Sequence, residues 1–181
     1  MARVPEVTAR ESLPEDKRPI FDAIAASRGR VGPPFSLLLN SPEVAGRIAH
    51  LGTYLRFETS LSPVDRELAM LTAARECDCE FEWAAHSRIG REAGVREEAI
   101  DIVTHRRPLD QLTEREALIV RYGRELLRDH RVSDATFEAA RARLGDQGVV
   151  DLTATIGYYS MLACALNAFG VEAPPGSPRL P

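Results

Sequence analysis

The hydrophobic pattern of this chain is that of a helical protein. In its middle, Val64, Met70, Leu71 and Ala74 share one helical face, and apolar residues continue at three- and four-residue spacing in the segment that follows. The strict alternation of apolar and polar residues that is typical of a half-buried strand is nearly absent. The pattern therefore predicts an all-α protein.

Start and stop signals divide the chain into about seven or eight helices. Serine or threonine marks the starts, either before proline or three residues before glutamate, and glycine marks most of the ends. The expected helices cover residues 12–26, 42–58, 63–76, 79–94, 96–105, 113–130, 133–145 and 148–168. Residues 172–181 are expected to form an extended tail. Because no linker to a second domain is found, residues 1–181 are expected to form a single-domain helical bundle.

Composition narrows the class of protein further. The chain has 181 residues, 44% of them hydrophobic and 28% charged, which is enough to bury a core. Its net charge of −4 is interspersed along the sequence and argues against a nucleic-acid surface. We find neither an uninterrupted apolar run long enough to span a membrane nor a signal peptide, so no membrane partner and a cytoplasmic location are expected. Three cysteines do not make a disulfide framework.

The candidate chemistry lies in the predicted helices 63–76 and 79–94. Cys79, Glu82 and His86 are spaced i, i+3 and i+7 and therefore fall on one side of a helix. The two helices are joined by almost no linker, so they are expected to fold back on each other with Glu67 at about the depth of His86. Glu67 shares its face with the apolar stripe and should point inward. Inward carboxylates and an imidazole have the shifted pKa values that general acid–base chemistry needs.

Each of these residues also has a plainer interpretation. Glu67 could simply pair with an arginine such as Arg75, and a histidine like His86 is often a satisfied core residue. Glu82 favours chemistry, because a glutamate four residues before a histidine can hydrogen-bond to it. Cys79, Glu82 and His86 could also bind a metal ion, but they spread over two turns and no companion ligand cluster is found elsewhere. We therefore expect no metal.

The cysteines do not form an obvious redox pair. Cys77 and Cys79 are one residue apart, so a helix would send them to roughly opposite faces, whereas a helical redox pair wants the i, i+3 spacing. Cys79 is expected in the first turn of its helix, where the helix N-terminus would lower its pKa. Cys164 lies in an apolar segment and is expected to be a small buried hydrophobe.

These motifs resemble the carboxymuconolactone decarboxylase family, within the wider alkylhydroperoxidase D-like superfamily. The similarity runs through GPPFSLLLNSPEVAGRIAHLGTYLRFETSL, RELAMLTAAR, EFEWAAHSRIGREAGV and GVVDLTATIGYYSMLACALNAFGV, and its most specific part is the Glu…Glu-Trp-x-x-His core that begins at Glu67. The resemblance implies a helical fold, chemistry without a cofactor, and assembly into homo-oligomers, often trimers or hexamers.

One position departs from the peroxidase branch of that superfamily. The resemblance aligns Glu67, Cys79 and His86 with that branch's glutamate, first cysteine and histidine. Glu82 occupies the place of the second cysteine, which in that branch attacks the peroxide. Glutamate at this place resembles the decarboxylase-type branch, whose members act on small acidic lactones or related carbonyl compounds.

The leading hypothesis is a cofactor-independent acid/base enzyme that carries out decarboxylation, isomerisation or elimination next to a carbonyl of a small anionic substrate. His86 would be the main acid/base, Glu82 its partner, and Glu67 a second acid/base or the group that keeps His86 protonated. One alternative is a thiol-dependent alkylhydroperoxidase that uses Cys79. Another is a non-catalytic helical protein for assembly or ligand binding.

Substrate contacts and assembly are less specified by the sequence. Trp83, Phe35 and Tyr158 are candidate pocket walls, and an anionic substrate would also need a cation. The candidate cations are Arg56, Arg75 and Arg88. The apolar run 149–169 has apolar residues on more than one face, so its helix is either central to the monomer or shared with a neighbouring subunit.

Overall fold

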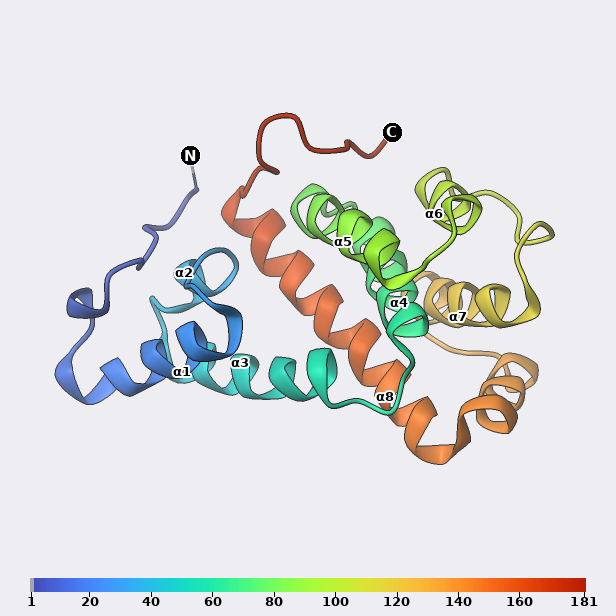
Figure 1. Cartoon of the computed structure of the whole chain (residues 1–181), viewed down its shortest axis with the longest axis horizontal. Helices are drawn as coiled ribbons and strands as arrows, with labels where there is room; N and C mark the ends of the chain where they lie inside the picture. Colours follow the sequence, from blue (N-terminus) through green and yellow to red (C-terminus); the bar gives the residue numbers. More distant parts are fainter. Residues whose placement is uncertain (1) are drawn as a thin grey trace. The chain divides into compact units, whose positions relative to one another are not determined.

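The computed structural model describes residues 2–181, and its regular elements are helices (Figure 1). The α-helices are α1 (Arg18–Arg28), α2 (Phe35–Leu38), α3 (Pro42–Phe57), α4 (Pro63–Glu76), α5 (Glu80–Ala93), α6 (Glu97–Thr104), α7 (Glu114–Arg124) and α8 (Asp134–Phe169). Two short 3-10 helices precede α1, and a π-helical turn follows α7. No strand occurs among residues 2–181, so the predicted all-α fold is confirmed.

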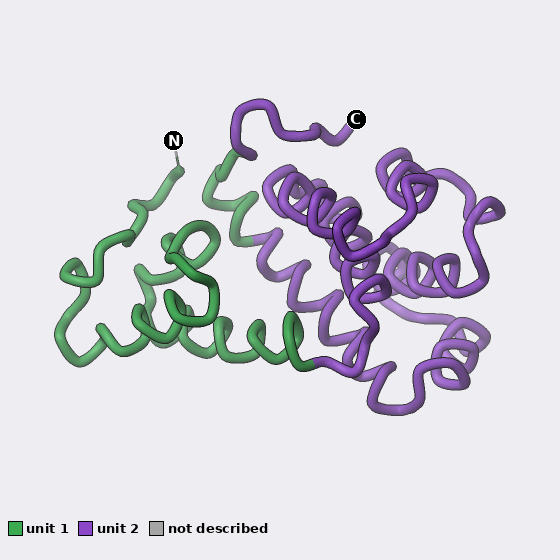
Figure 2. Tube along the Cα trace, viewed as in Figure 1, with its two compact units in different colours: residues 1–58, 165–172 green, residues 59–164, 173–181 purple. Residues whose placement is uncertain are grey.

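The chain divides into two compact units (Figure 2). The smaller unit comprises residues 1–58 and 165–172, and the larger one comprises residues 59–164 and 173–181. Helices α4 to α7 and most of α8 belong to the larger unit. The single domain expected over residues 1–181 stays a prediction.

Helix α4 forms the core of the larger unit. It packs against α5, α6 and α7, and the side chains of Leu68, Met70 and Leu71 are completely buried. Because most of its residues are apolar or small on every side, α4 is covered all round, as expected for a central helix. A polar side chain on α4 therefore lies inside the protein unless it is at an end.

Local capping explains where α4 and α7 begin. The hydroxyl of Ser62 accepts a hydrogen bond from the backbone N–H of Asp65, and Pro63 occupies the first turn. Thr113 and Glu116 form a reciprocal capping box at the start of α7. Both helices begin where the sequence predicted, since these caps depend only on neighbouring residues.

The first predicted helix begins later than expected. Ser12 ends a 3-10 helix instead of capping an α-helix, and α1 begins only at Arg18, with Pro19 in its first turn. Leu13 is extended, with φ −97° and ψ 148°. A residue before proline is driven away from the helical conformation, and Leu13 precedes Pro14. The expected helix over 12–26 is therefore wrong in its first six residues.

Helix α8 contains a break where the sequence predicted a helix end. Gly145 adopts φ 73° and ψ 175°, so residues before and after it form two helical segments, as expected for 133–145 and 148–168. One 18-residue window of α8 has a mean hydropathy of 1.4. By length and composition alone, α8 is therefore long and apolar enough to cross a membrane. However, 56% of that window is buried inside the protein, which is also the behaviour of a core helix. The cytoplasmic location stays a prediction.

Candidate active site

The α4–α5 hairpin brings the predicted site residues together. Cys77 ends α4, and Asp78 adopts a left-handed conformation with φ 47°, which aspartate tolerates better than most residues. The backbone N–H of Cys79 then donates to the carbonyl of Ala74, so the chain reverses within a few residues. Glu67 on α4 and His86 on α5 consequently face each other.

Gly90 allows the two helices to approach closely at this point. A Cβ atom added at Gly90 would lie 3.1 Å from Cδ1 of Leu71 and 3.8 Å from Cβ of Glu67. The α5 backbone therefore packs directly on the part of α4 that carries the buried carboxylate. A larger residue at this position would push the hairpin apart.

His86 lies between two carboxylates. Its Nδ1 is 2.7 Å from Oε2 of Glu67, and its Nε2 is 3.4 Å from Oε2 of Glu82. All three residues are buried, with exposed fractions of 2% for Glu67, 4% for Glu82 and 2% for His86. We call Glu67, Glu82 and His86 the buried triad.

The electrostatics of the buried triad favour a charged imidazole. Burial acts to lower the pKa of His86, but the hydrogen bonds with Glu67 and Glu82 act more strongly together and raise it to about 9. His86 is therefore an imidazolium at neutral pH. Both of its N–H groups then donate, the Nδ1–H to Glu67 at the shorter distance and the Nε2–H toward Glu82 at the longer one.

An aromatic ring packs directly against the imidazole. The ring of Tyr159 on α8 meets His86 edge-on, with 4.9 Å between ring centroids and an interplanar angle of 88°. Tyr158 packs edge-on against Tyr159 at 5.5 Å, and Trp83 lies next to Glu82 on α5 with 2% of its surface exposed. Two of the predicted pocket-wall residues thus lie in the larger unit. Trp83 is on α5, the helix that carries Glu82 and His86, and Tyr158 packs against Tyr159. Tyr159, which touches His86 directly, was missed by the sequence analysis.

The remaining predicted substrate contacts, Phe35 and Arg56, belong to the smaller unit. There the guanidinium of Arg28 stacks over the ring of Phe35 at 4.1 Å, and that of Arg56 lies 5.6 Å from the ring centre of Phe57. Their role in substrate binding stays a prediction.

Cys79 does not have the reactive thiol that the sequence suggested. It stands at the N-cap of α5 and is completely buried. Burial raises its pKa to about 11, although the backbone N–H groups of Phe81 and Glu82 act in the opposite direction. The expected lowering of the Cys79 pKa is therefore wrong, because desolvation of the thiolate exceeds the effect of the helix N-terminus.

The other two cysteines differ from each other in burial. Cys77 is partly buried, and burial raises its pKa. Cys164 is exposed, so its prediction as a buried hydrophobe is wrong. It lies on α8 next to the fully buried Ala163, and on a helix the adjacent position turns away from the core.

Two candidate cations are committed to other partners. Arg75 is buried and donates from Nε to the carbonyl of Thr104 at 2.6 Å, so it ties α4 to α6. Arg88 is exposed and pairs with Glu92 at 2.6 Å on the surface of α5. The hydrogen bond of Arg75 and the ion pair of Arg88 therefore do not involve the buried triad. Within residues 2–181, no group of three or more histidine, cysteine, aspartate or glutamate side chains is arranged to hold a metal ion.

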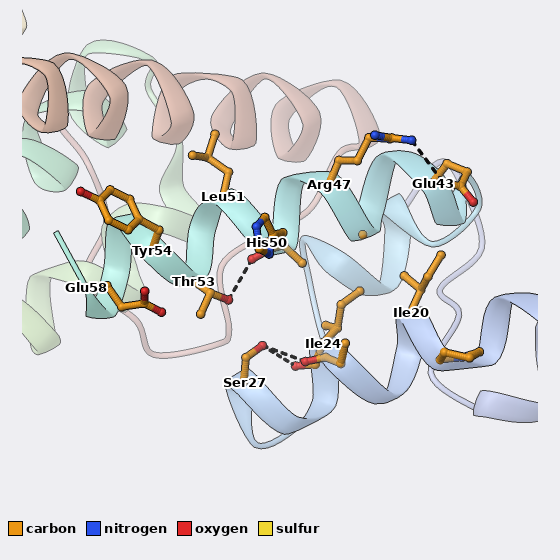
Figure 3. Close-up of a pocket in the computed structure, with 14 residues that line it drawn as sticks. Ile20, Ile24, Ser27, Glu43, Arg47, His50, Leu51, Thr53, Tyr54 and Glu58 are labelled. Atoms are coloured by element: carbon orange, nitrogen blue, oxygen red, sulfur yellow. Dashed lines mark hydrogen bonds and ion pairs between the residues drawn. The ribbon is translucent and has the colours of Figure 1, made fainter.

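The smaller unit carries a separate groove between α1 and α3 (Figure 3). Its volume is about 990 Å³, and its walls are mainly apolar. Polar side chains such as His50 and Glu58 stand along it, but it contains none of the predicted site residues.

These observations define the structural class of the protein: it is an all-α protein in which a helical hairpin buries a glutamate–histidine pair. The sequence model of the carboxymuconolactone decarboxylase family matches residues 42–122, which include the whole buried triad. No curated protein matches the chain. Together with the fold described next, the family match confirms the predicted resemblance. Residues 42–122 are thus similar to the carboxymuconolactone decarboxylase family, and the fold of the chain is alkylhydroperoxidase D-like.

Solved structures share the fold at low sequence identity. A peroxidase-related protein from Ralstonia eutropha JMP134 with an alkylhydroperoxidase AhpD core is 21% identical, has a TM-score of 0.77, and is matched over 96% of this chain and 93% of its own. A peroxidase-related protein from Silicibacter sp. TM1040 is 17% identical, with a TM-score of 0.72 over 94% and 93% of the two chains. The debrominase Bmp8 is 14% identical, with a TM-score of 0.69 over 93% and 92%. A cysteine-to-alanine variant of Bmp8 has been solved with 2,3,4-tribromopyrrole.

Proposed function

We propose that this protein is a cofactor-independent acid/base enzyme that acts next to the carbonyl of a small anionic substrate. The observation that carries the proposal is the position of His86, buried between Glu67 and Glu82 with its pKa raised to about 9. A buried imidazole that is held in its charged form and oriented by two carboxyl groups is suited to proton transfer in catalysis.

The two carboxylates have different roles in this proposal. Glu67 makes the shorter hydrogen bond, 2.7 Å to Nδ1, so it orients the ring and keeps it charged. The contact between Nε2 and Glu82 is 3.4 Å long and therefore weaker, which leaves the Nε2 proton as the one to be transferred. Glu82 lies beside that proton and can act as the base in an isomerisation or elimination.

A decarboxylation illustrates the proton balance. The bond between the substrate carbon and its carboxylate breaks, CO₂ leaves, and the electron pair remains as an enolate conjugated with the carbonyl. The His86 imidazolium stabilises the enolate by its charge and then transfers the Nε2 proton to carbon. Water returns a proton to His86 before the next turnover. The edge-on contact of Tyr159 and the burial of His86 keep bulk water away from the imidazole.

Thiol chemistry is less well supported in this chain. The structures that share the fold include a peroxidase-related protein and a debrominase. In this chain, a Cys79 pKa of about 11 leaves on the order of one thiolate in ten thousand molecules at pH 7. Cys77 has a raised pKa as well, and Glu82 stands where the resemblance expects the attacking cysteine. Assembly into a trimer or hexamer stays a prediction.

The proposal is tested with a panel of small keto and lactone carboxylates and with a hydroperoxide plus a dithiol. We expect turnover of an acid substrate that is lost in His86→Ala and Glu82→Gln, while helical circular dichroism is retained in both. We expect no hydroperoxide consumption that depends on Cys79, with Cys79→Ser as the comparison. Full activity in both triad variants, or hydroperoxide turnover abolished by Cys79→Ser, would contradict the acid/base proposal.

A further inference from the structure

One arginine next to the buried triad has a buried N–H group without a hydrogen-bond partner among residues 2–181. Arg66 precedes Glu67 on α4, and its side chain is 18% exposed. Its Nε atom is buried and makes no hydrogen bond to these residues. Oε1 of Glu67 lies 3.9 Å from Nε, too far for a hydrogen bond. An unsatisfied buried donor on a charged group costs free energy, so the Nε–H of Arg66 is available to an acceptor from a ligand.

Arg66 differs in this from the arginines that the sequence analysis considered. Arg75 and Arg88 are hydrogen-bonded to partners of their own, and Arg56 lies over an aromatic ring in the smaller unit. Arg66 alone among these four lies within ion-pair distance of a member of the buried triad. The two groups approach different oxygens of the Glu67 carboxyl group. His86 is hydrogen-bonded to Oε2, and the guanidinium of Arg66 faces Oε1.

The charge of the site indicates what kind of ligand Arg66 would take. Two of the three side chains of the buried triad are carboxyl groups, which do not attract an anion. Arg66 places a guanidinium beside them, with its Nε 3.9 Å from Oε1 of Glu67. Guanidinium groups bind carboxylates through paired N–H donors, which fits an acceptor that is planar and has two oxygens.

We propose that Arg66 binds the carboxylate of the substrate and thereby places the substrate's carbonyl carbon beside His86. This assignment rests on the proposed acid/base function and adds to it the residue that holds the carboxylate of the substrate. The carboxylate bound by Arg66 is one that stays on the molecule during proton transfer. A neutral lactone or ketone lacks this contact and binds more weakly.

Binding of a simple probe tests the assignment without turnover. The probe is levulinate, a keto carboxylate, and methyl levulinate is its neutral counterpart. Titrations followed by ligand-observed NMR compare the wild-type protein with Arg66→Gln, Arg66→Lys and the surface control Arg88→Gln. We expect levulinate to bind the wild type and Arg88→Gln equally, and Arg66→Gln to bind it about tenfold or more weakly. Arg66→Lys should fall between them, because lysine keeps the charge but not the paired donors.

A second readout follows the buried triad itself. A carboxylate bound at Arg66 adds a negative charge near His86, so levulinate should raise the pKa of His86 further in the wild type and not in Arg66→Gln. Equal binding of levulinate by the wild type and Arg66→Gln, equal binding of the acid and its ester, or no binding of levulinate by the wild type would each overturn the assignment. These results concern Arg66 only, whereas failure of the acid/base function would appear as an ordinary His86 pKa in the protein without levulinate.

Discussion

Replacing Glu67 with glutamine should make the stability of this protein depend much less on pH. Glu67→Gln keeps the shape of the side chain and an oxygen that can accept from Nδ1 of His86, but it removes the negative charge. The hydrogen bond between them is 2.7 Å long and buried, so its charged form is among the stronger kinds. Hydrogen bonds to charged groups contribute roughly 1.5–3 kcal/mol, which corresponds to a fall of about 1–2 in the pKa of His86.

The sign of the pH dependence follows from the raised pKa. The pKa of His86 rises from the ordinary 6.5 to about 9 in the folded protein, so the folded state holds the proton more tightly than the unfolded chain. The resulting stabilisation is complete below pH 6.5 and is lost as the pH rises through 9. At about 1.4 kcal/mol per pKa unit, it amounts to about 3 kcal/mol, and Glu67→Gln should leave about 1–2 kcal/mol of it.

The assay is urea unfolding of the wild type and Glu67→Gln at pH 6 and near pH 10. The variant should be less stable than the wild type at pH 6, and the difference should shrink or reverse near pH 10, where His86 is neutral and no longer forms an ion pair with the buried Glu67. Glu82→Gln serves as the matched control, since its longer 3.4 Å contact predicts a smaller effect of the same sign. A destabilisation by Glu67→Gln that is equal at both pH values would refute the reasoning.

Two further substitutions and one labelling experiment test other parts of the structure. Gly90→Leu should lower the free energy of unfolding by about 1–3 kcal/mol in urea titrations, because its Cβ alone would lie 3.1 Å from Leu71 and the rest of the side chain has no room, and an unchanged midpoint would contradict the close approach. Thr155→Val should be neutral or stabilising by about 1 kcal/mol, since the Thr155 hydroxyl is buried with no hydrogen-bond partner in the described part of the chain, and a clear loss of stability would show that this hydroxyl is bonded. Cys79 should resist iodoacetamide at pH 7 in the folded protein, as mass spectrometry of the labelled peptides would show, and rapid labelling would contradict its raised pKa.

Local signals predicted most of the fold, and tertiary packing limited the rest. Ser62 and Thr113 cap their helices through bonds that span three residues, so the sequence suffices to place these starts. Ser12 failed because the residue before Pro14 is extended, an effect that competes with the capping signal. The face of Cys164 was misjudged because an apolar neighbourhood does not say which side of a helix meets the core.

The site shows the same division. Glu67, Glu82 and His86 could be grouped from helical spacing and a short hairpin, because both features are local. The contact of Tyr159 with His86 joins α8 to α5 and leaves no periodic signal in the sequence. The pKa of Cys79 depends on how deeply the hairpin is buried, and the missing partner of Arg66 can be seen only once all neighbours are placed.

The most direct test of the central claim is an NMR titration of His86 in the wild-type protein, with its imidazole signals assigned by comparison with His86→Ala. A buried proton donor held by two carboxylates predicts a pKa of about 9, with a charged imidazole throughout the neutral range. A pKa at or below 6.5 would mean that burial outweighs Glu67 and Glu82, and that His86 does not carry the proton on which the proposed chemistry depends.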